Sequence, residues 1–215
     1  MSTENVSEKD EWRDLIEEIK KCRRCPLHQN RTNAVPGEGS VNADIMIIGE
    51  APGANEDLSG RPFVGAAGTL LRKILREIGF DEEKIYITNV VKCRPPGNRK
   101  PNKDEIDACS PYLRRQIIYI KPKIIIALGN VAGEWIFREA GLQWDSISRN
   151  RGRIYETNLY GMKISVIPSF HPSAVIRGSV DEDILRKDLL LAKSLLENEK
   201  KIQRKPLSLY DFLKK

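Results

Sequence analysis

The sequence ADIMIIG, residues 43–49, is a compact apolar run that ends in glycine and leads directly into Glu50-Ala51-Pro52-Gly53. An apolar run of this length, closed by turn-forming residues, predicts a buried strand. Four more segments predict strands in the same way: 85–91 (IYITNVV), 123–128 (KIIIAL), 153–157 and 163–167.

Segments with helical periodicity separate these strands. We expect helices at 10–20, 68–78, 103–118, 131–140 and 181–199. Asn102, followed three residues later by Glu105, predicts a capping box at the start of the third helix. Strands that alternate with helices predict an α/β fold, with three layers (α/β/α) and a central, mostly parallel sheet covered on both faces. In such sheets, ligands bind beyond the carboxyl ends of the strands.

The length of 215 residues suits one domain with short appendages. We expect the domain to span 10–199, between a disordered N-terminus (1–9) and a basic C-terminal tail (200–215). The 36 basic residues outnumber the 30 acidic ones, and the resulting net charge of +6 favours a polyanionic partner. Solvated surface charge is the alternative. Two basic clusters are candidates for the anion-binding surface: Lys92, Arg94, Arg99, Lys100 and Lys103, and also Arg149, Arg151 and Arg153.

Hydropathy argues against a membrane protein. No apolar run approaches the roughly 20 residues that cross a bilayer. Acids outnumber bases in the first 20 residues, which is unlike a secretory leader. We therefore expect no membrane association and a cytoplasmic location.

Four cysteines have the spacing of metal ligands. Cys22 and Cys25 follow the first predicted helix, Cys93 follows the second predicted strand, and Cys109 lies in the next predicted helix. A chain without a secretory leader rarely uses four cysteines as disulfides. Four thiolates suit zinc and an iron–sulfur cluster equally well, and either centre would be structural because no coordination position stays open. The alternatives are four unrelated thiols or a redox pair at Cys22 and Cys25.

Chemically versatile residues follow three of the predicted strands. Glu50 and Glu56 lie in the glycine- and proline-rich loop after the first strand, Asn89 lies near the end of the second, and His171 follows the last. Phe63, held between prolines and glycines, either offers a stacking surface or plugs the core. An amide, an imidazole, carboxylates and an aromatic face together suit the recognition of a nucleobase.

These residues together resemble the family-4 uracil-DNA glycosylases, the iron–sulfur-containing type of thermophilic bacteria and archaea. The resemblance covers about residues 12–197. It rests on GEAPG at 49–53 with Glu56-Asp57, GRPFVG at 60–65, Thr88-Asn89, His171-Pro172-Ser173 and the four cysteines. It implies a four-stranded parallel sheet and a structural [4Fe–4S] cluster, rather than zinc, on Cys22, Cys25, Cys93 and Cys109. It also implies an enzyme of base excision repair that flips deoxyuridine out of DNA, hydrolyses its N-glycosidic bond, releases uracil and leaves an abasic site.

The resemblance assigns roles to individual residues. Phe63 would stack on the uracil, Asn89 would read its O4 and N3 edge, and His171 would hydrogen-bond O2 and stabilise the leaving group. Catalytic roles would fall to Glu50, Glu56 and His171, with Glu50, Glu56 or a substrate phosphate positioning the attacking water. The residues expected to bind uracil are Gly49, Glu50, Ala51, Phe63, Asn89 and His171.

Contacts to DNA are expected at Ser173, Arg177, Arg99 and Lys100. The residue that fills the vacated base stack would be Val175, Ile176 or Arg177. Family-1 enzymes carry an aspartate and a tyrosine where this chain has Ala51 and Gly53. Thymine exclusion therefore falls to another group, for which Glu56 and the backbone that it orders are candidates.

The tail segment Leu209-Tyr210-Asp211-Phe212-Leu213 resembles a sliding-clamp-binding peptide. Leu209, Phe212 and Leu213 would be its anchors, and a disordered basic tail that raises DNA affinity is the alternative. We expect a monomer. The alternative functions are a non-catalytic, DNA-binding or polymerase-associated relative with a structural metal cluster, and a nucleotide-binding enzyme with zinc.

Overall fold

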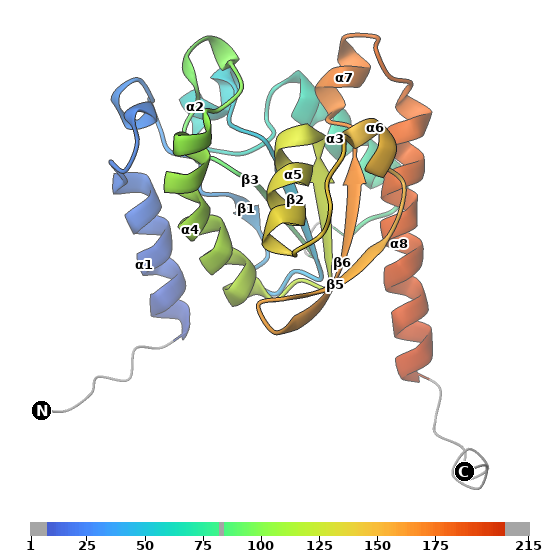
Figure 1. Ribbon diagram of the computed structural model, residues 1–215. Helices are drawn as coiled ribbons and strands as arrows, with labels where there is room; N and C mark the ends of the chain where they lie inside the picture. Colours follow the sequence, from blue (N-terminus) through green and yellow to red (C-terminus); the bar gives the residue numbers. More distant parts are fainter. Residues whose placement is uncertain (1–7, 82–83, 205–215) are drawn as a thin grey trace, which may run out of the picture.

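A computed structural model describes residues 8–81 and 84–204 (Figure 1). Its sheet has the strand order β1-β3-β2-β4-β6-β5. The strands are β1 (Glu38–Gly39), β2 (Ile45–Gly49), β3 (Ile85–Asn89), β4 (Ile124–Leu128), β5 (Tyr155–Leu159) and β6 (Met162–Ser169). Strands β3, β2, β4 and β6 are parallel to one another, whereas β1 and β5 pair antiparallel at the two edges. The predicted mostly parallel sheet is therefore confirmed, and the resemblance's four parallel strands form its centre.

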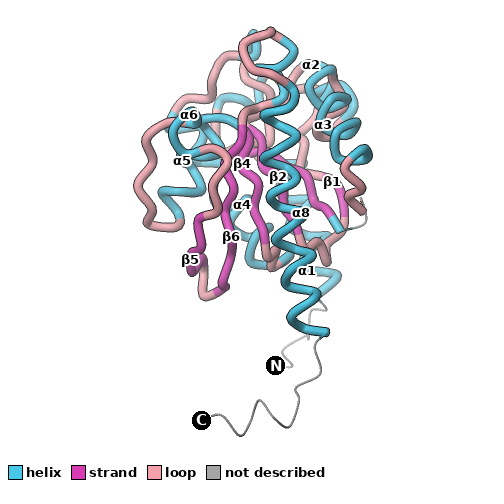
Figure 2. Tube along the Cα trace, turned by 90° about the vertical axis from the view of Figure 1, so that its right-hand side faces the viewer, coloured by secondary structure: helices cyan, strands magenta, loops and turns pink. Residues whose placement is uncertain are grey.

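The sheet is covered on both faces because its central strands are apolar on both sides. Met46 and Ile48 of β2 enter one core, while Ile45 and Ile47 enter the other. Helices α1, α4 and α5 contribute to the first core, and α3 and α8 to the second (Figures 1 and 2). These helices are α1 (Glu8–Lys21), α3 (Ala66–Glu77), α4 (Lys103–Ile120), α5 (Gly129–Glu139) and α8 (Glu182–Arg204).

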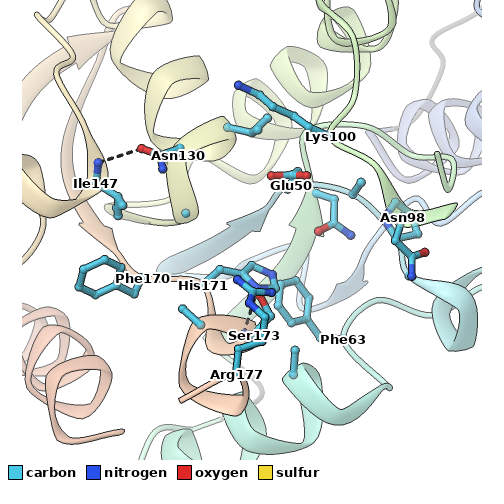
Figure 3. Close-up of a pocket in the computed structure, with 18 of the residues that line it drawn as sticks. Glu50, Phe63, Asn98, Lys100, Asn130, Ile147, Phe170, His171, Ser173 and Arg177 are labelled. Carbon is cyan, nitrogen blue, oxygen red and sulfur yellow. Dashed lines mark hydrogen bonds between the residues drawn. The ribbon is translucent and has the colours of Figure 1, made fainter. Parts of the chain in front are cut away.

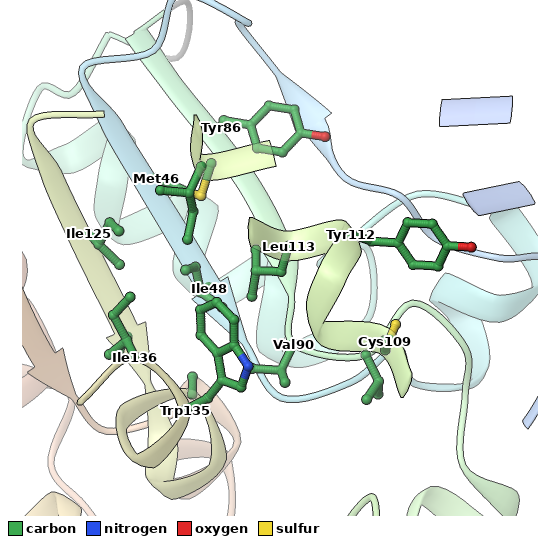
Figure 4. Close-up of a cluster of buried hydrophobic side chains, with 14 of the residues drawn as sticks. Met46, Ile48, Tyr86, Val90, Cys109, Tyr112, Leu113, Ile125, Trp135 and Ile136 are labelled. Atoms are coloured by element: carbon green, nitrogen blue, oxygen red, sulfur yellow. The ribbon is translucent and has the colours of Figure 1, made fainter. Parts of the chain in front are cut away.

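The first core shows how a buried polar group is satisfied. Trp135 of α5 belongs to this core together with Ile48 and Leu113 (Figure 4). Its indole Nε1 donates a hydrogen bond to Ser110 Oγ at 2.7 Å. The large ring is thereby buried without leaving its N–H group unpaired.

The predicted helices all exist, with ends that differ by a few residues. The capping box of α4 is confirmed, because Glu105 accepts a hydrogen bond from the backbone N–H of Asn102 at 2.7 Å. Several short elements were not predicted: α2 (Ala54–Ser59), α6 (Ile147–Asn150), α7 (Pro172–Ile176) and the 3-10 turns η1 (Pro26–Gln29) and η3 (Pro96–Asn98).

The predicted flanking segments fall mostly outside the described residues. Residues 8–9 belong to α1 and residues 200–204 to α8. Residues 1–7 and 205–215, the latter including the proposed clamp anchors Leu209, Phe212 and Leu213, lie outside the described part. Among the helices that the structure describes, none combines the length and the apolar character needed to cross a membrane.

Candidate active site

The carboxyl ends of the parallel strands open into a cavity of about 900 Å³ (Figure 3). Its walls come from the loops that follow β2, β3, β4 and β6, where a parallel sheet is expected to bind ligands. Most of the predicted site residues line it: Glu50, Ala51, Glu56, Phe63, Asn89, Arg99, Lys100, His171, Ser173 and Arg177. The structure thus brings together residues that are up to 127 positions apart in sequence, counted from Glu50 to Arg177.

Phe63 is held in an unusual backbone conformation. Its φ is +52°, a region that few non-glycine residues adopt. Gly68 packs directly on the Phe63 backbone, and a Cβ on Gly68 would lie 1.9 Å from the Phe63 carbonyl oxygen. Arg72 Nε donates to the same oxygen at 3.3 Å. Helix α3 therefore fixes the position of the phenylalanine ring at the cavity wall.

Asn89 and Phe63 meet over Gly49. Asn89 is paired in register with Gly49 across β3 and β2. A Cβ on Gly49 would lie 2.4 Å from Asn89 Oδ1 and 2.6 Å from Phe63 Cζ. A larger residue in place of Gly49 would therefore clash with both side chains, although Gly49 does not itself line the cavity. Asn89 is 2% exposed, and no hydrogen bond joins its side-chain amide to another described residue, which leaves the amide available to a ligand.

His171 caps the N-terminus of α7 and is held as a neutral donor. Its Nδ1 accepts a hydrogen bond from the Ser173 backbone N–H at 3.2 Å and lies 2.8 Å from Ser173 Oγ. Burial, with a smaller contribution from the positive charge of Arg177, lowers the pKa of His171 to about 4, and Glu56 opposes this shift. Because Nδ1 is an acceptor and the ring is neutral at pH 7, the ring proton is on Nε2. The His171 ring lies beside Phe63, with 5.7 Å between ring centroids (Figure 3).

The two candidate carboxylates differ in their bonding. Glu56 Oε1 accepts from the backbone N–H groups of Val64 and Gly65 at 2.9 and 2.8 Å, and Oε2 accepts from that of Gly53 at 3.0 Å. It therefore ties the loop after β2 to the segment that carries Phe63. Glu50 has no hydrogen bond from its carboxyl group to another described residue. Burial raises the pKa of Glu50, and Lys100 opposes that shift.

The residues predicted to contact DNA differ in whether their polar groups already have a partner in the protein. Lys100, Ser173 and Arg177 line the cavity. Arg99 also lines it, but its guanidinium forms two hydrogen bonds to the buried Glu105 at 2.8 and 2.6 Å. One member of the predicted surface cluster is wrongly assigned. Lys92 is only 1% exposed, because its ammonium lies under the end of β3.

The second predicted basic cluster is partly neutralised. Arg149 pairs with Asp145 at 2.6 Å. Arg151 pairs with the buried Asp188 and covers the ring of Phe170, with 5.7 Å from its guanidinium carbon to the ring centroid. Their charges therefore contribute less to an anion-binding surface than the sequence alone indicates.

Comparison with known proteins agrees with this geometry. Residues 36–191 match the model of the uracil DNA glycosylase superfamily. A type-4 uracil-DNA glycosylase of Saccharolobus solfataricus is 48% identical over 202 residues, which cover 93% of this chain and 91% of that protein. Type-4 enzymes of Archaeoglobus fulgidus and Thermotoga maritima are 49% and 45% identical, covering 76% and 89% of this chain and 82% and 98% of their own lengths.

This chain belongs to the type-4 uracil-DNA glycosylase family. The resemblance found in the sequence motifs is therefore confirmed. Three residues of the family motifs line one cavity, as expected if they bind the same ligand: Phe63, Asn89 and His171.

Cys22 and Cys25 follow α1, Cys93 follows β3 and Cys109 lies within α4. The four thiols are near enough to interact electrostatically. Burial raises the pKa of Cys25 and Cys93, and raises that of Cys109 to about 12; the neighbouring thiols contribute to each shift. Cys93 Sγ accepts a hydrogen bond from Arg31 Nη1 at 3.0 Å, and Cys109 Sγ accepts one from the Lys92 backbone N–H at 3.3 Å. Within the described residues, no three metal-ligating side chains converge tightly enough for a single metal ion.

Sequence reasoning missed several cavity residues. Asn98, Asn130, Ile147 and Phe170 also line the cavity of this glycosylase-family chain. Asn130 Oδ1 accepts the backbone N–H of Ile147 at 2.9 Å and so anchors α6 at the rim (Figure 3). Asn130 follows the end of β4, a position that the strand pattern marks as functional. Ile147 has no such signal, because only tertiary packing brings α6 to the cavity.

Proposed function

We propose that this chain hydrolyses the N-glycosidic bond of deoxyuridine in DNA. Water adds to C1′ of the sugar, the bond between C1′ and N1 breaks, and uracil and an abasic site are the products. The observation that carries the proposal is that Phe63, Asn89 and His171 meet in one cavity, in a chain of the type-4 family. Extrusion of the base costs a few kcal/mol, and the least for a mismatched pair.

The cavity supports selective binding of uracil. The ring of Phe63, held by Gly68 and Arg72, offers an aromatic face for stacking. The Asn89 amide, which has one donor end and one acceptor end, pairs with O4 and N3–H of uracil. Cytosine presents the opposite order of donor and acceptor on that edge. A single fixed amide therefore distinguishes the two bases.

His171 supports departure of the base. The glycosidic bond breaks through an oxocarbenium-like sugar, and negative charge develops on the leaving uracil. The Nε2–H group of neutral His171 donates to O2, where that charge accumulates. A preorganised donor of this kind is typically worth about 3 kcal/mol of barrier. Because its pKa is about 4, His171 performs this role without first gaining a proton.

We assign the two carboxylates different roles. Glu56 acts as a positioning residue, because both of its oxygens are occupied by backbone N–H groups. Glu50 has its carboxyl group free in the cavity wall and orients the attacking water. Ala51 and the backbone at Gly49 shape the base pocket beside them. Lys100, Arg177 and Ser173 contact DNA phosphates at the rim, while Arg99 supports the loop through Glu105.

We propose that Cys22, Cys25, Cys93 and Cys109 hold a structural [4Fe–4S] cluster. The donor set fits, because four gathered thiols with cationic neighbours at Arg31 and Lys92 suit an anionic thiolate cluster. Thiols that are near one another without converging on one point suit a body of several atoms better than one zinc ion. When bound, the cluster supplies a cross-link between α1, α4 and the loop after β3.

A uracil-containing oligonucleotide tests the proposal. The protein is incubated with a labelled strand that contains one deoxyuridine, and abasic sites are then cleaved with alkali. We expect cleavage at uracil and none at thymine or cytosine in matched strands. If protein equimolar to the DNA binds the strand but produces no cleavage, the chain is a non-catalytic DNA-binding protein and the proposal is wrong. Iron and zinc analysis of the same sample identifies the occupant of the cysteines.

A further inference from the structure

Lys92 is a buried lysine without a carboxylate hydrogen-bonded to it among the described residues. Its Nζ donates to Thr88 Oγ1 at 2.6 Å and to the Asn89 carbonyl oxygen at 2.7 Å. Both acceptors lie at the carboxyl end of β3. Burying an ammonium group is costly unless hydrogen bonds and opposite charge compensate for it, so this lysine requires an explanation.

The other contacts of Lys92 lead to the cysteines. Its backbone N–H donates to Cys109 Sγ at 3.3 Å, and Cys93 is the next residue. Both cysteines lie close enough to the Lys92 side chain to interact with it electrostatically. Its carbonyl oxygen accepts from the Val35 backbone N–H at 2.7 Å. One residue thus joins the cysteine-bearing loop to the strand end that presents Asn89.

We propose that Lys92 is a positioning residue for base recognition: it fixes the position of Asn89 relative to the cysteine-bearing loop. The inference rests on the proposed base-reading role of Asn89. The tightness of the site makes this positioning consequential. Asn89 Oδ1 lies 2.4 Å from the point where a Cβ on Gly49 would be, with the Phe63 ring at 2.6 Å from the same point. A small shift of the Asn89 backbone therefore moves the amide out of its slot.

Fold stability alone does not account for a lysine here. Thr88 Oγ1 already donates to the Pro36 carbonyl oxygen at 2.7 Å, so the strand end is fixed without Lys92. Lys92→Met removes the donor to the Thr88 hydroxyl and the Asn89 carbonyl oxygen, and a buried acceptor left without its donor lowers stability. A purely structural role therefore predicts a loss of stability without a slower rate in the folded protein, whereas a positioning role predicts a defect in catalysis.

A double-mutant cycle tests the inference. Single-turnover rates of uracil excision are measured for the wild type, Lys92→Met, Asn89→Ala and the double variant, each normalised to its iron content and absorbance near 400 nm. We expect Lys92→Met to lower the rate roughly tenfold to a hundredfold in the wild-type background. In the Asn89→Ala background the same change should cost less than about threefold, because the group that it positions is gone. Lys163→Met, at an exposed lysine paired with Glu156, is the matched control and should leave the rate unchanged.

The outcomes separate the possible failures. Equal losses in both backgrounds, or no loss in either, would overturn the inference while leaving uracil excision intact. A loss of rate that disappears on normalisation to iron content would also overturn it, because Lys92 would then act only through the bound cluster. If Asn89→Ala itself keeps the wild-type rate, the base-reading role of Asn89 fails first. Should Lys92→Met not fold, Thr88→Val removes one ammonium acceptor and should show coupling to Asn89→Ala of the same sign.

Discussion

The protonation state of His171 gives the sharpest quantitative prediction. Burial lowers the pKa of His171 from 6.5 to about 4. The folded protein therefore resists a proton that the unfolded chain accepts, and folding stability falls as the pH decreases from 6.5 to 4. At about 1.4 kcal/mol per pH unit, the full loss is about 3 kcal/mol below pH 4. About 2 kcal/mol of it is already lost at pH 5, where most carboxylates are still ionised.

Guanidinium unfolding of the wild type and of His171→Gln measures this loss. The glutamine keeps a side-chain donor but does not titrate, so the groups common to both proteins cancel in the difference. Between pH 7.5 and pH 5 the wild type should lose about 2 kcal/mol more than the variant. Equal losses would refute the argument. NMR titration adds a direct check, because His171 and His28 are the only histidines. A His171 ring that titrates near 6.5, or that carries its proton on Nδ1, would contradict the assigned donor.

Four further predictions follow from single contacts. Asn89→Asp should weaken discrimination against cytosine, and unchanged relative rates on cytosine- and uracil-containing strands would count against base reading by this residue. Gly68→Ala places a methyl group against the Phe63 backbone. It should lower the free energy of unfolding, measured with denaturant, by about 1–3 kcal/mol, as overpacking does. An unchanged free energy of unfolding would mean that the Phe63 backbone moves freely. Glu56→Gln should release the loop amides and slow excision without weakening DNA affinity in a binding titration, whereas a loss confined to affinity would argue against positioning. Cys109→Ser should reduce iron content and the melting temperature together, and wild-type values of both would exclude it as a ligand.

Much of the fold was predictable because its signals are local. The apolar runs of β2, β3 and β4 and the capping box of Asn102 and Glu105 depend on neighbours in sequence. Strand ends in a parallel sheet converge on one edge, so Asn89 and His171 were predictable as partners. The two-residue strand β1 was not predictable, because it forms only through its pairing with β3.

Other features depend on contacts that no local pattern reveals. Lys92 belongs to a basic run, and its burial follows from acceptors at the end of β3 and from cysteines of two different segments. Glu56 is a first-turn acid of α2, but its bonds to Val64 and Gly65 require the left-handed turn at Phe63. Sequence indicated which chemical groups are present, and the tertiary structure determined which of them are free to act.

A structure of the protein with free uracil tests most directly whether Phe63, Asn89 and His171 bind a single base together. We predict that the uracil ring lies on the face of Phe63, with the Asn89 amide at O4 and N3 and His171 Nε2 at O2. Uracil bound elsewhere in the cavity, or bound without contact to Asn89 and His171, would contradict the account.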